Sequence, residues 1–174
     1  LTEEEFDSLV CASWIIDNNG REMRVRMKPH AQLAILIADF TGMRMGEILD
    51  MRWDGINFAD ETYMVLDSKN GEQRVVPLHP ELMKVLNQMP RHCDYVVSWK
   101  GEKITGRIHH SIEKACVEAG IKDFRFHDLR HRAVTRWVQM GHPMSTIMDA
   151  TGHRTTSMHL RYSNLKGVNA KTLV

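Results

Sequence analysis

The sequence predicts a mainly helical domain with one small antiparallel β-sheet, an α+β fold. Three observations lead to this prediction. Apolar residues recur at helical spacing along most of the 174-residue chain. Two short runs of strand-forming residues lie near the middle, on either side of an Asn70-Gly71 turn signal. No internal repeat, low-complexity tract or linker divides the sequence, so we expect one domain over residues 1–174, with a tail at about 163–174.

The first expected element is an N-terminal helix. Thr2 followed by Glu5 forms a capping box, in which each side chain bonds the backbone N–H of the other residue. Apolar residues then recur at helical spacing as far as Trp14. The run Asn18-Asn19-Gly20 is expected to end this helix.

Proline and glycine mark the ends of most elements that follow. Proline is favoured in the first turn of a helix, whereas glycine commonly ends a helix or turns a hairpin. The expected elements are, in order, a helix from Pro29 that Gly42 interrupts, a short helix over 45–49, strands over 63–66 and 74–76, a helix from Pro80, a strand over 95–97, and helices at about 105–119, 127–140, 143–150 and 157–163.

Composition is that of an ordinary globular protein, with 43% hydrophobic and 26% charged residues. No apolar run approaches the roughly 18 residues that a membrane span requires, so we expect no membrane partner. Cys11, Cys93 and Cys116 are odd in number and lack CxxC spacing, which fits reduced thiols in a cytosolic protein better than a disulfide framework. Because the chain begins on Leu1 rather than Met, we expect it to be part of a longer protein.

Charge is distributed unevenly, although the formal net charge is only +1. Residues 1–97 contain 10 lysines and arginines against 16 acidic residues, whereas residues 98–174 contain 13 against 6. Most of the histidines also lie in the second segment. Such asymmetry is expected of a protein with one face that meets phosphates, although a solvated basic surface gives the same pattern.

Five short motifs carry the residue types that phosphodiester chemistry needs. Arginine can hold a phosphate through bidentate hydrogen bonds, histidine and lysine can transfer protons, and a phenol can act as a nucleophile. The motifs are TGMRMGEIL with Arg44, SKNGEQRVVPL with Lys69, HDLRH with His127 and Arg130, TGH with His153, and LRYSNL with Tyr162. Together they supply the parts needed to break a phosphodiester bond without a metal.

The order, spacing and local sequence of these motifs resemble the catalytic domain of the tyrosine recombinases, the phage integrase family. The resemblance runs from Leu1 to about Leu165, and HDLRH is its most specific string. It implies the catalytic-domain fold of that family and the activity of a site-specific DNA recombinase, with integrase as the default. The implied reaction is metal-free DNA cleavage and rejoining through a covalent 3′-phosphotyrosine, with no cofactor.

Three of the motif residues are implied to stabilise negative charge on the scissile phosphate: Arg44, Arg130 and His153. The expected ion pair of Arg44 with Glu47, three residues later, would hold that arginine in place. At the last position the family commonly has Leu-Gly-His, whereas this chain has Thr-Gly-His, which keeps the histidine.

The other three are implied to handle the covalent step and its protons. Tyr162 would attack the phosphorus, His127 would accept or share its proton, and Lys69 would protonate the leaving 5′ oxygen. Of the chain's other tyrosines, Tyr63 and Tyr95 both lie in expected strands with apolar neighbours, which favours packing roles for them.

HDLRH also allows a different chemical interpretation, a zinc site. His127 and His131 are four residues apart, as in the HExxH zinc helix, but Asp128 replaces the glutamate and Arg130 would place a positive charge beside the metal. We therefore expect His131 to be a structural or DNA-facing residue that supports the site, and no metal. A type IB topoisomerase, or a DNA-binding protein that has lost catalysis, are the alternative functions.

The resemblance also implies partners. These are double-stranded DNA with its attachment sites, three further copies of the chain in a homotetramer assembled on DNA, and accessory DNA-bending proteins. The N-terminal DNA-binding domain of the family has no counterpart in this chain, and the tail is expected to dock on a neighbouring subunit. The expected location is the cytoplasm of a bacterium or of a phage host.

Overall fold

The computed structural model describes residues 1–10, 14–16, 22–24, 27–66, 73–105 and 108–152. Its elements are, in chain order, α1 (Glu3–Val10), β1 (Trp14–Ile16), β2 (Glu22–Arg24), α2 (Pro29–Thr41), α3 (Met45–Leu49), a 3-10 turn η1 (Trp53–Gly55), β3 (Ile56–Asn57), β4 (Thr62–Leu66), β5 (Gln73–Pro77), α4 (Pro80–Gln88), β6 (Ser98–Trp99), β7 (Glu102–Lys103), α5 (Ile108–Glu118), α6 (Phe126–Gln139) and α7 (Met144–Thr151). The predicted class, mainly helical with a small antiparallel β-sheet, is confirmed. Among these residues no helix is long and apolar enough to cross a membrane.

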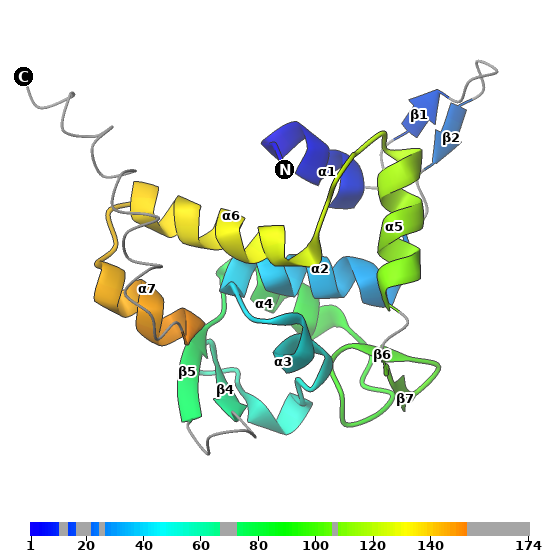
Figure 1. The fold of residues 1–174 in the computed structure, drawn as a ribbon. Helices are drawn as coiled ribbons and strands as arrows, with labels where there is room; N and C mark the ends of the chain where they lie inside the picture. The colour runs from blue at the N-terminus through cyan, green and yellow to red at the C-terminus, as the bar shows by residue number, and fades with distance from the viewer. Residues whose placement is uncertain (11–13, 17–21, 25–26, 67–72, 106–107, 153–174) are drawn as a thin grey trace, which may run out of the picture.

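Helix α2 forms the centre of the molecule (Figure 1). It packs against α1, α3, α4, α5 and α6, and most of its side chains are buried, including Ile35 and Ile37. Burial on every side explains why its sequence, PHAQLAILIADFT, is apolar almost all round rather than along one stripe. Pro29 occupies its first turn and Gly42 its C-terminal cap, as the sequence predicts.

The largest sheet has the order β3-β4-β5, with antiparallel neighbours. Tyr63 pairs with Val76, and both side chains are buried, whereas the adjacent pair Met64 and Val75 faces outward. This alternation follows from the two-residue period of a strand and orients the sheet with one face on the core. Helix α7 lies beside β5 at the edge of this sheet (Figure 1).

The first helix is shorter than the sequence predicts. The Thr2–Glu5 capping box is confirmed, because Thr2 N–H donates to Glu5 Oε2 at 2.8 Å and Glu5 N–H donates to Thr2 Oγ1 at 3.1 Å. The helix nevertheless ends at Val10, and Trp14 lies in strand β1, which pairs with β2. Trp14-Ile15-Ile16 is an aromatic and β-branched run, and such residues favour strands over helices.

The predicted strand over residues 95–97 is also wrong. Tyr95 forms only an isolated bridge with Arg52, and the nearby strand is β6, one residue beyond the predicted range. Here the backbone bonds a distant loop instead of a strand: Val96 N–H donates to Met51 O at 2.9 Å. The described residues form three small sheets rather than the one predicted, since β1-β2 and β6-β7 form separate pairs. The Asn70-Gly71 turn and the helix at 157–163 lie outside the described residues.

Helix α7 is attached to α6 through a small apolar cluster that is separate from the main core. Its buried members are Val134, Val138, Met144 and Ile147. Trp137 and Met148 cover this cluster, and Trp137 also lies against the space beside Gly42. The contact brings the C-terminal end of α7 toward the break between α2 and α3.

Candidate active site

Arg44 lies at the break between α2 and α3, where the sequence predicts it. Gly42 ends α2 with a φ of +63°, and a Cβ there would lie 3.3 Å from Thr151 Cγ2. Glycine adopts this left-handed conformation without the penalty that a side chain incurs. The chain then turns directly into α3, with Arg44 as its N-cap and its side chain 46% exposed. A half-exposed guanidinium on a helix boundary can meet an anion from solvent.

Glu47 holds Arg44 in two ways. Its Oε2 accepts the backbone N–H of Arg44 at 2.8 Å, and its Oε1 pairs with Arg44 Nη1 at 3.0 Å. Arg74 reaches the same carboxylate from β5, with its Nη2 at 2.6 Å from Glu47 Oε2. Burial of Glu47 opposes ionisation, but the hydrogen bonds and charges of Arg74 and Arg44 outweigh it, so the pKa of this carboxyl lies below its usual value. The predicted Arg44–Glu47 ion pair is therefore confirmed.

Arg130 is the most deeply buried charged side chain in the described part of the chain, at 1% exposure. It lies on α6 and points toward the α2–α3 break. Its Nη1 donates to Gly42 O and its Nη2 to Thr151 O, both at 2.6 Å. The guanidinium thus ties the turn before Arg44 to the end of α7. Two short, charge-assisted bonds to carbonyls are consistent with the burial of an arginine at this position.

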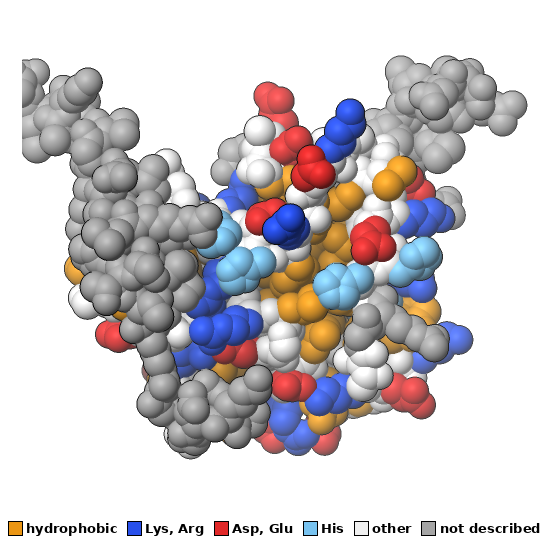
Figure 2. Space-filling model, viewed as in Figure 1, with side chains coloured by type: hydrophobic (Ala, Val, Ile, Leu, Met, Phe, Trp, Pro, Cys, Tyr) orange, Lys and Arg blue, Asp and Glu red, His pale blue; other side chains and the backbone are white. Residues whose placement is uncertain are grey.

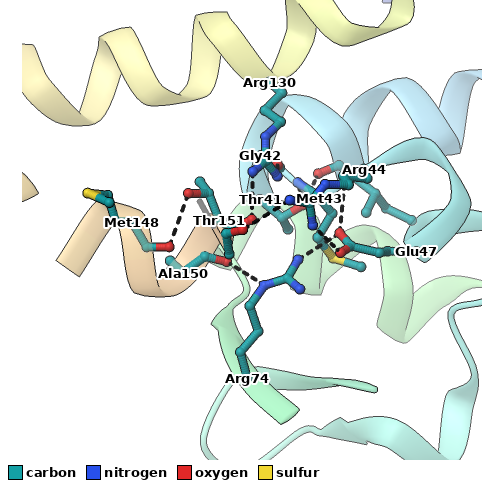
Figure 3. Close-up of polar contacts among 12 residues, drawn as sticks. Thr41, Gly42, Met43, Arg44, Glu47, Arg74, Arg130, Met148, Ala150 and Thr151 are labelled. Carbon is teal, nitrogen blue, oxygen red and sulfur yellow. Dashed lines mark hydrogen bonds and ion pairs between the residues drawn. The ribbon is translucent and has the colours of Figure 1, made fainter. Parts of the chain in front are cut away.

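Three arginines from three elements converge on the C-terminal end of α7 (Figure 3). Ala150 O accepts from Arg74 Nε at 3.0 Å, Thr151 O from Arg130 Nη2 at 2.6 Å, and Gly152 O from Arg44 Nη2 at 3.0 Å. The last carbonyls of a helix lack partners within the helix and carry the negative end of its dipole, so they favour cations. These bonds place the guanidinium groups of Arg44 and Arg130 beside the turn that leads to His153.

His127 and His131 lie on the first two turns of α6. Asp128 Oδ2 accepts the N–H of Arg125 at 2.9 Å and so fixes the start of the helix. The two imidazole rings are 4.8 Å apart, edge to face, which confirms that they share one face. His127 is exposed. The face of the molecule that Figure 2 draws carries several histidine and basic side chains, with acidic side chains among them.

The structure describes about half of the predicted site. It brings together Arg44, Glu47 and Arg130, whereas Lys69, His153 and Tyr162 lie outside the described residues. Gly152, the residue before His153, is held directly by Arg44. Among the described side chains, no group of three or more His, Cys, Asp or Glu residues is arranged to hold a metal ion.

Sequence reasoning gave no role to Arg74, although the structure places it between Glu47 and Ala150. The alternation of inward and outward side chains along β5 indicates the position of Arg74. Arg74 lies two residues before the buried Val76, so both project from the same face of the sheet. An arginine at an inward-facing strand position needs a buried partner.

Comparison with known proteins assigns the family. The model of the phage integrase family matches residues 2–167. The chain belongs to this family. It is 36% identical over 132 residues to a shufflon-specific DNA recombinase of Escherichia coli, an alignment that covers 72% of this chain and 32% of the relative. It is 26% identical over 168 residues to the integrase of Salmonella phage P22, covering 87% and 43% of the two chains.

Solved structures of the phage integrase family share the fold. The XerA recombinase matches with a TM-score of 0.73 at 20% identity, over 100% of this chain and 63% of that one. The catalytic domain of bacteriophage HP1 integrase matches with a TM-score of 0.67 at 22% identity, over 94% and 86%. A lambda integrase tetramer bound to a Holliday junction matches with a TM-score of 0.65 at 22% identity, over 89% and 46%. The chain is thus a tyrosine recombinase or integrase catalytic domain, and it spans between 32% and 60% of the length of four curated relatives.

Proposed function

We propose that this domain cleaves and rejoins DNA strands through a covalent bond between Tyr162 and a 3′ phosphate. The observation that carries the proposal is the convergence of Arg44 and Arg130 beside the turn that precedes His153. Negative charge builds on the non-bridging oxygens when a phosphodiester is attacked, and fixed cationic donors stabilise that charge. The family membership of residues 2–167 supports the same chemistry.

In the proposed reaction the Oη of Tyr162 attacks phosphorus while the bond from phosphorus to the 5′ oxygen breaks. His127 takes or shares the phenolic proton, and Lys69 gives a proton to the leaving 5′ oxygen. A 5′ hydroxyl of a second duplex then attacks the phosphotyrosine and releases the tyrosine. The number of phosphodiester bonds is unchanged, so neither step needs a high-energy cofactor.

Arg44 and Arg130 differ in how accessible their guanidinium groups are to DNA. Arg44 is half exposed, so a phosphate can exchange with its bond to Gly152 O without disturbing the core. Arg130 is 1% exposed, and its guanidinium meets a phosphate only after a local rearrangement around the α7 end. We propose that DNA binding supplies this rearrangement, since a phosphate can replace the carbonyls as acceptor.

The proposed partners are double-stranded DNA and further copies of the chain, with a homotetramer as the active assembly. The lambda integrase tetramer on a Holliday junction supports this proposal through a shared fold. We propose that the parent protein carries an N-terminal DNA-binding domain, that residues 1–174 are the catalytic domain, and that the tail at 163–174 docks on a neighbouring subunit. Target sequence and site selection belong to the whole protein.

A library of nicked duplexes with a randomised central sequence provides the test. The nick lets the cleaved 5′ end diffuse away, so a covalent protein–DNA adduct accumulates and survives denaturation. We expect an adduct in a metal chelator with wild type and with Tyr95→Phe, the matched tyrosine control. Tyr162→Phe should give none. Cleavage that requires a divalent metal, an adduct with Tyr162→Phe, or no adduct from any duplex would each contradict the proposal.

A paired assay separates recombination from topoisomerase activity. Duplexes that give adducts are placed as two sites on one supercoiled plasmid, and both exchange between sites and loss of supercoiling are measured. Exchange between the two sites is expected. Relaxation without exchange would identify type IB topoisomerase activity instead.

A further inference from the structure

Arg74 contacts both halves of the candidate site, although it is not one of the six motif residues to which a catalytic role is assigned. Its side chain is 14% exposed and lies on β5, shortly after Lys69 in the sequence. Its Nη2 donates to Glu47 Oε2 at 2.6 Å, and its Nε donates to Ala150 O at 3.0 Å. One guanidinium therefore joins the helix that carries Arg44 to the helix that leads to His153.

The turn at the end of α7 is shaped to receive this guanidinium. Gly152 has a φ of +68°, and a Cβ at this position would lie 3.2 Å from Arg74 Cζ and Nη1. Any larger residue at position 152 would be strained by the left-handed backbone and would also press against the side chain of Arg74. Arg74 is therefore packed against the turn as well as bonded to it (Figure 3).

The contact with Glu47 determines how Arg44 is held. Glu47 Oε2 accepts from both Arg74 and the backbone of Arg44, while its Oε1 pairs with the Arg44 side chain. The carboxylate plane is thus fixed by donors on two sides. Without Arg74, Glu47 retains bonds only to Arg44 within its own helix among the described contacts, and it can rotate together with that arginine.

We propose that Arg74 is a positioning residue for strand cleavage. Through its bond to Glu47 it fixes the orientation of the Arg44 guanidinium, and through its bond to Ala150 it fixes the position of that guanidinium relative to the Ala150–Gly152 turn. This inference rests on the proposed function. Arg74 does not touch the reacting phosphate in this scheme. It acts on the geometry of Arg44, and a displacement of about 1 Å in a catalytic group can cost about 100-fold in rate.

The test measures single-turnover cleavage of the duplex that gives the most adduct with wild type. Arg74→Gln, Arg74→Lys and Glu47→Gln are compared with Arg52→Gln, a half-exposed arginine of a separate ion-pair group with Asp54 and Asp94. For each variant the rate constant at saturating DNA, the reaction amplitude, the DNA affinity and the urea unfolding curve are recorded. The rate constant reports the geometry of folded enzyme, whereas the amplitude reports how much enzyme is folded and active.

We expect Arg74→Gln to lower the rate constant by about 10- to 100-fold with little change in affinity or amplitude. Arg74→Lys should recover part of the rate, since one ammonium restores the charge but cannot match both acceptors as a guanidinium does. The double variant that combines Arg74→Gln with Glu47→Gln should cleave no more slowly than the slower of the two single variants, because both substitutions remove the same Arg74–Glu47 contact. Arg52→Gln should cleave at the wild-type rate.

Two results would overturn the inference: a wild-type rate constant for Arg74→Gln, whatever its amplitude, or a double variant whose loss is the product of the single losses. Each of them leaves wild-type cleavage intact and so leaves the proposed function standing. Absence of cleavage by wild type would instead remove the proposed function. If Arg74→Gln fails to fold, the rate constant of Arg74→Lys and its coupling to Glu47→Gln decide the question.

Discussion

Arginine side chains at this site serve as structural donors before any substrate binds. Arg130 bonds two carbonyls that are distant in the sequence, and Arg74 bonds a carboxylate and a carbonyl. The planar guanidinium offers several N–H groups in fixed directions, which a lysine does not. These bonds hold the backbone from which Arg44 extends, and Arg44 is the half-exposed member of the group that can meet a phosphate without a rearrangement.

Glu47 allows the residue-scale arrangement to be tested through pH. Its folded-state pKa lies below the usual value because Arg74 and Arg44 outweigh the effect of burial. The carboxylate therefore stabilises the fold above about pH 4.5, and this contribution is lost as the pH falls through the lower folded-state pKa. We expect Glu47→Gln to reduce the free energy of unfolding by about 2 kcal/mol at pH 7.

Urea denaturation of wild type and Glu47→Gln at pH 7 and at about pH 3.5 measures this effect. The difference between the two proteins should narrow at the acidic pH. Glu81→Gln is the matched control, since Glu81 is exposed and pairs with the exposed Lys84. It should change stability little at either pH. A Glu47→Gln difference that is the same at both pH values would show that the charge is not what stabilises this contact.

At the scale of elements, a buried charge joins α6 to α2. Asp39 is 2% exposed, and its carboxylate accepts Arg132 Nε and Arg136 Nη1, both at 2.8 Å. The two arginines lie one turn apart on α6, on the same helix that carries His127 and Arg130. This pairing fixes the rotation of α6 about its axis, and with it the direction in which Arg130 points.

Asp39→Ala should therefore be strongly destabilising. It leaves two partly buried guanidinium groups without their carboxylate, and removal of one partner from such a pair costs about 3 kcal/mol or more. Urea unfolding measures the loss, with Asp7→Ala on the exposed face of α1 as control. A loss no larger than that of Asp7→Ala would mean that apolar packing alone sets the α2–α6 contact.

Two glycines with similar φ angles allow the cost of backbone strain to be separated from the cost of packing. One of them, Gly42, lies at the α2–α3 break, and the other, Gly120, follows α5. Gly42 has a φ of +63° and would place a Cβ 3.3 Å from Thr151, whereas Gly120 has a φ of +71° and open space around it. We expect Gly120→Ala to cost about 1–2 kcal/mol for the left-handed backbone. Gly42→Ala should cost more, because α7 must also move. Equal losses in urea unfolding would show that α7 yields to the added methyl group freely.

These elements also show what the sequence could predict. The capping box, Pro29, Gly42 and the Arg44–Glu47 pair are local signals, and each was confirmed because residues near in sequence determine them. The end of α1 and the loop at Tyr95 were predicted wrongly, since pairing with distant backbone decides both. The period of β5 indicates that Arg74 faces inward, but its partners Glu47 and Ala150 come from two other elements, so spacing alone does not identify them.

For the molecule as a whole, the charge pattern concerns binding rather than folding. A net charge of +1 gives no attraction to DNA by itself, but the basic excess lies in residues 98–174, which hold α5, α6 and α7. The candidate site joins these helices to α3 and β5, so the half-exposed Arg44 lies where that basic segment meets the acidic one. Phosphate contacts release counterions, and each one adds about 0.9 to the magnitude of the slope of log affinity against log salt on duplex DNA.

Salt dependence thus tests which arginine faces the DNA. Anisotropy titrations of a labelled duplex over a range of salt concentrations give the slope for each variant. Arg44→Gln should reduce its magnitude by about one, because one phosphate contact is lost. Arg52→Gln should leave the slope unchanged, since Arg52 is engaged by Asp54 and Asp94 away from the α7 end. If Arg52→Gln reduced the slope and Arg44→Gln did not, the DNA would lie over the Arg52 surface, and the arginines around α7 would hold the fold together without meeting a phosphate.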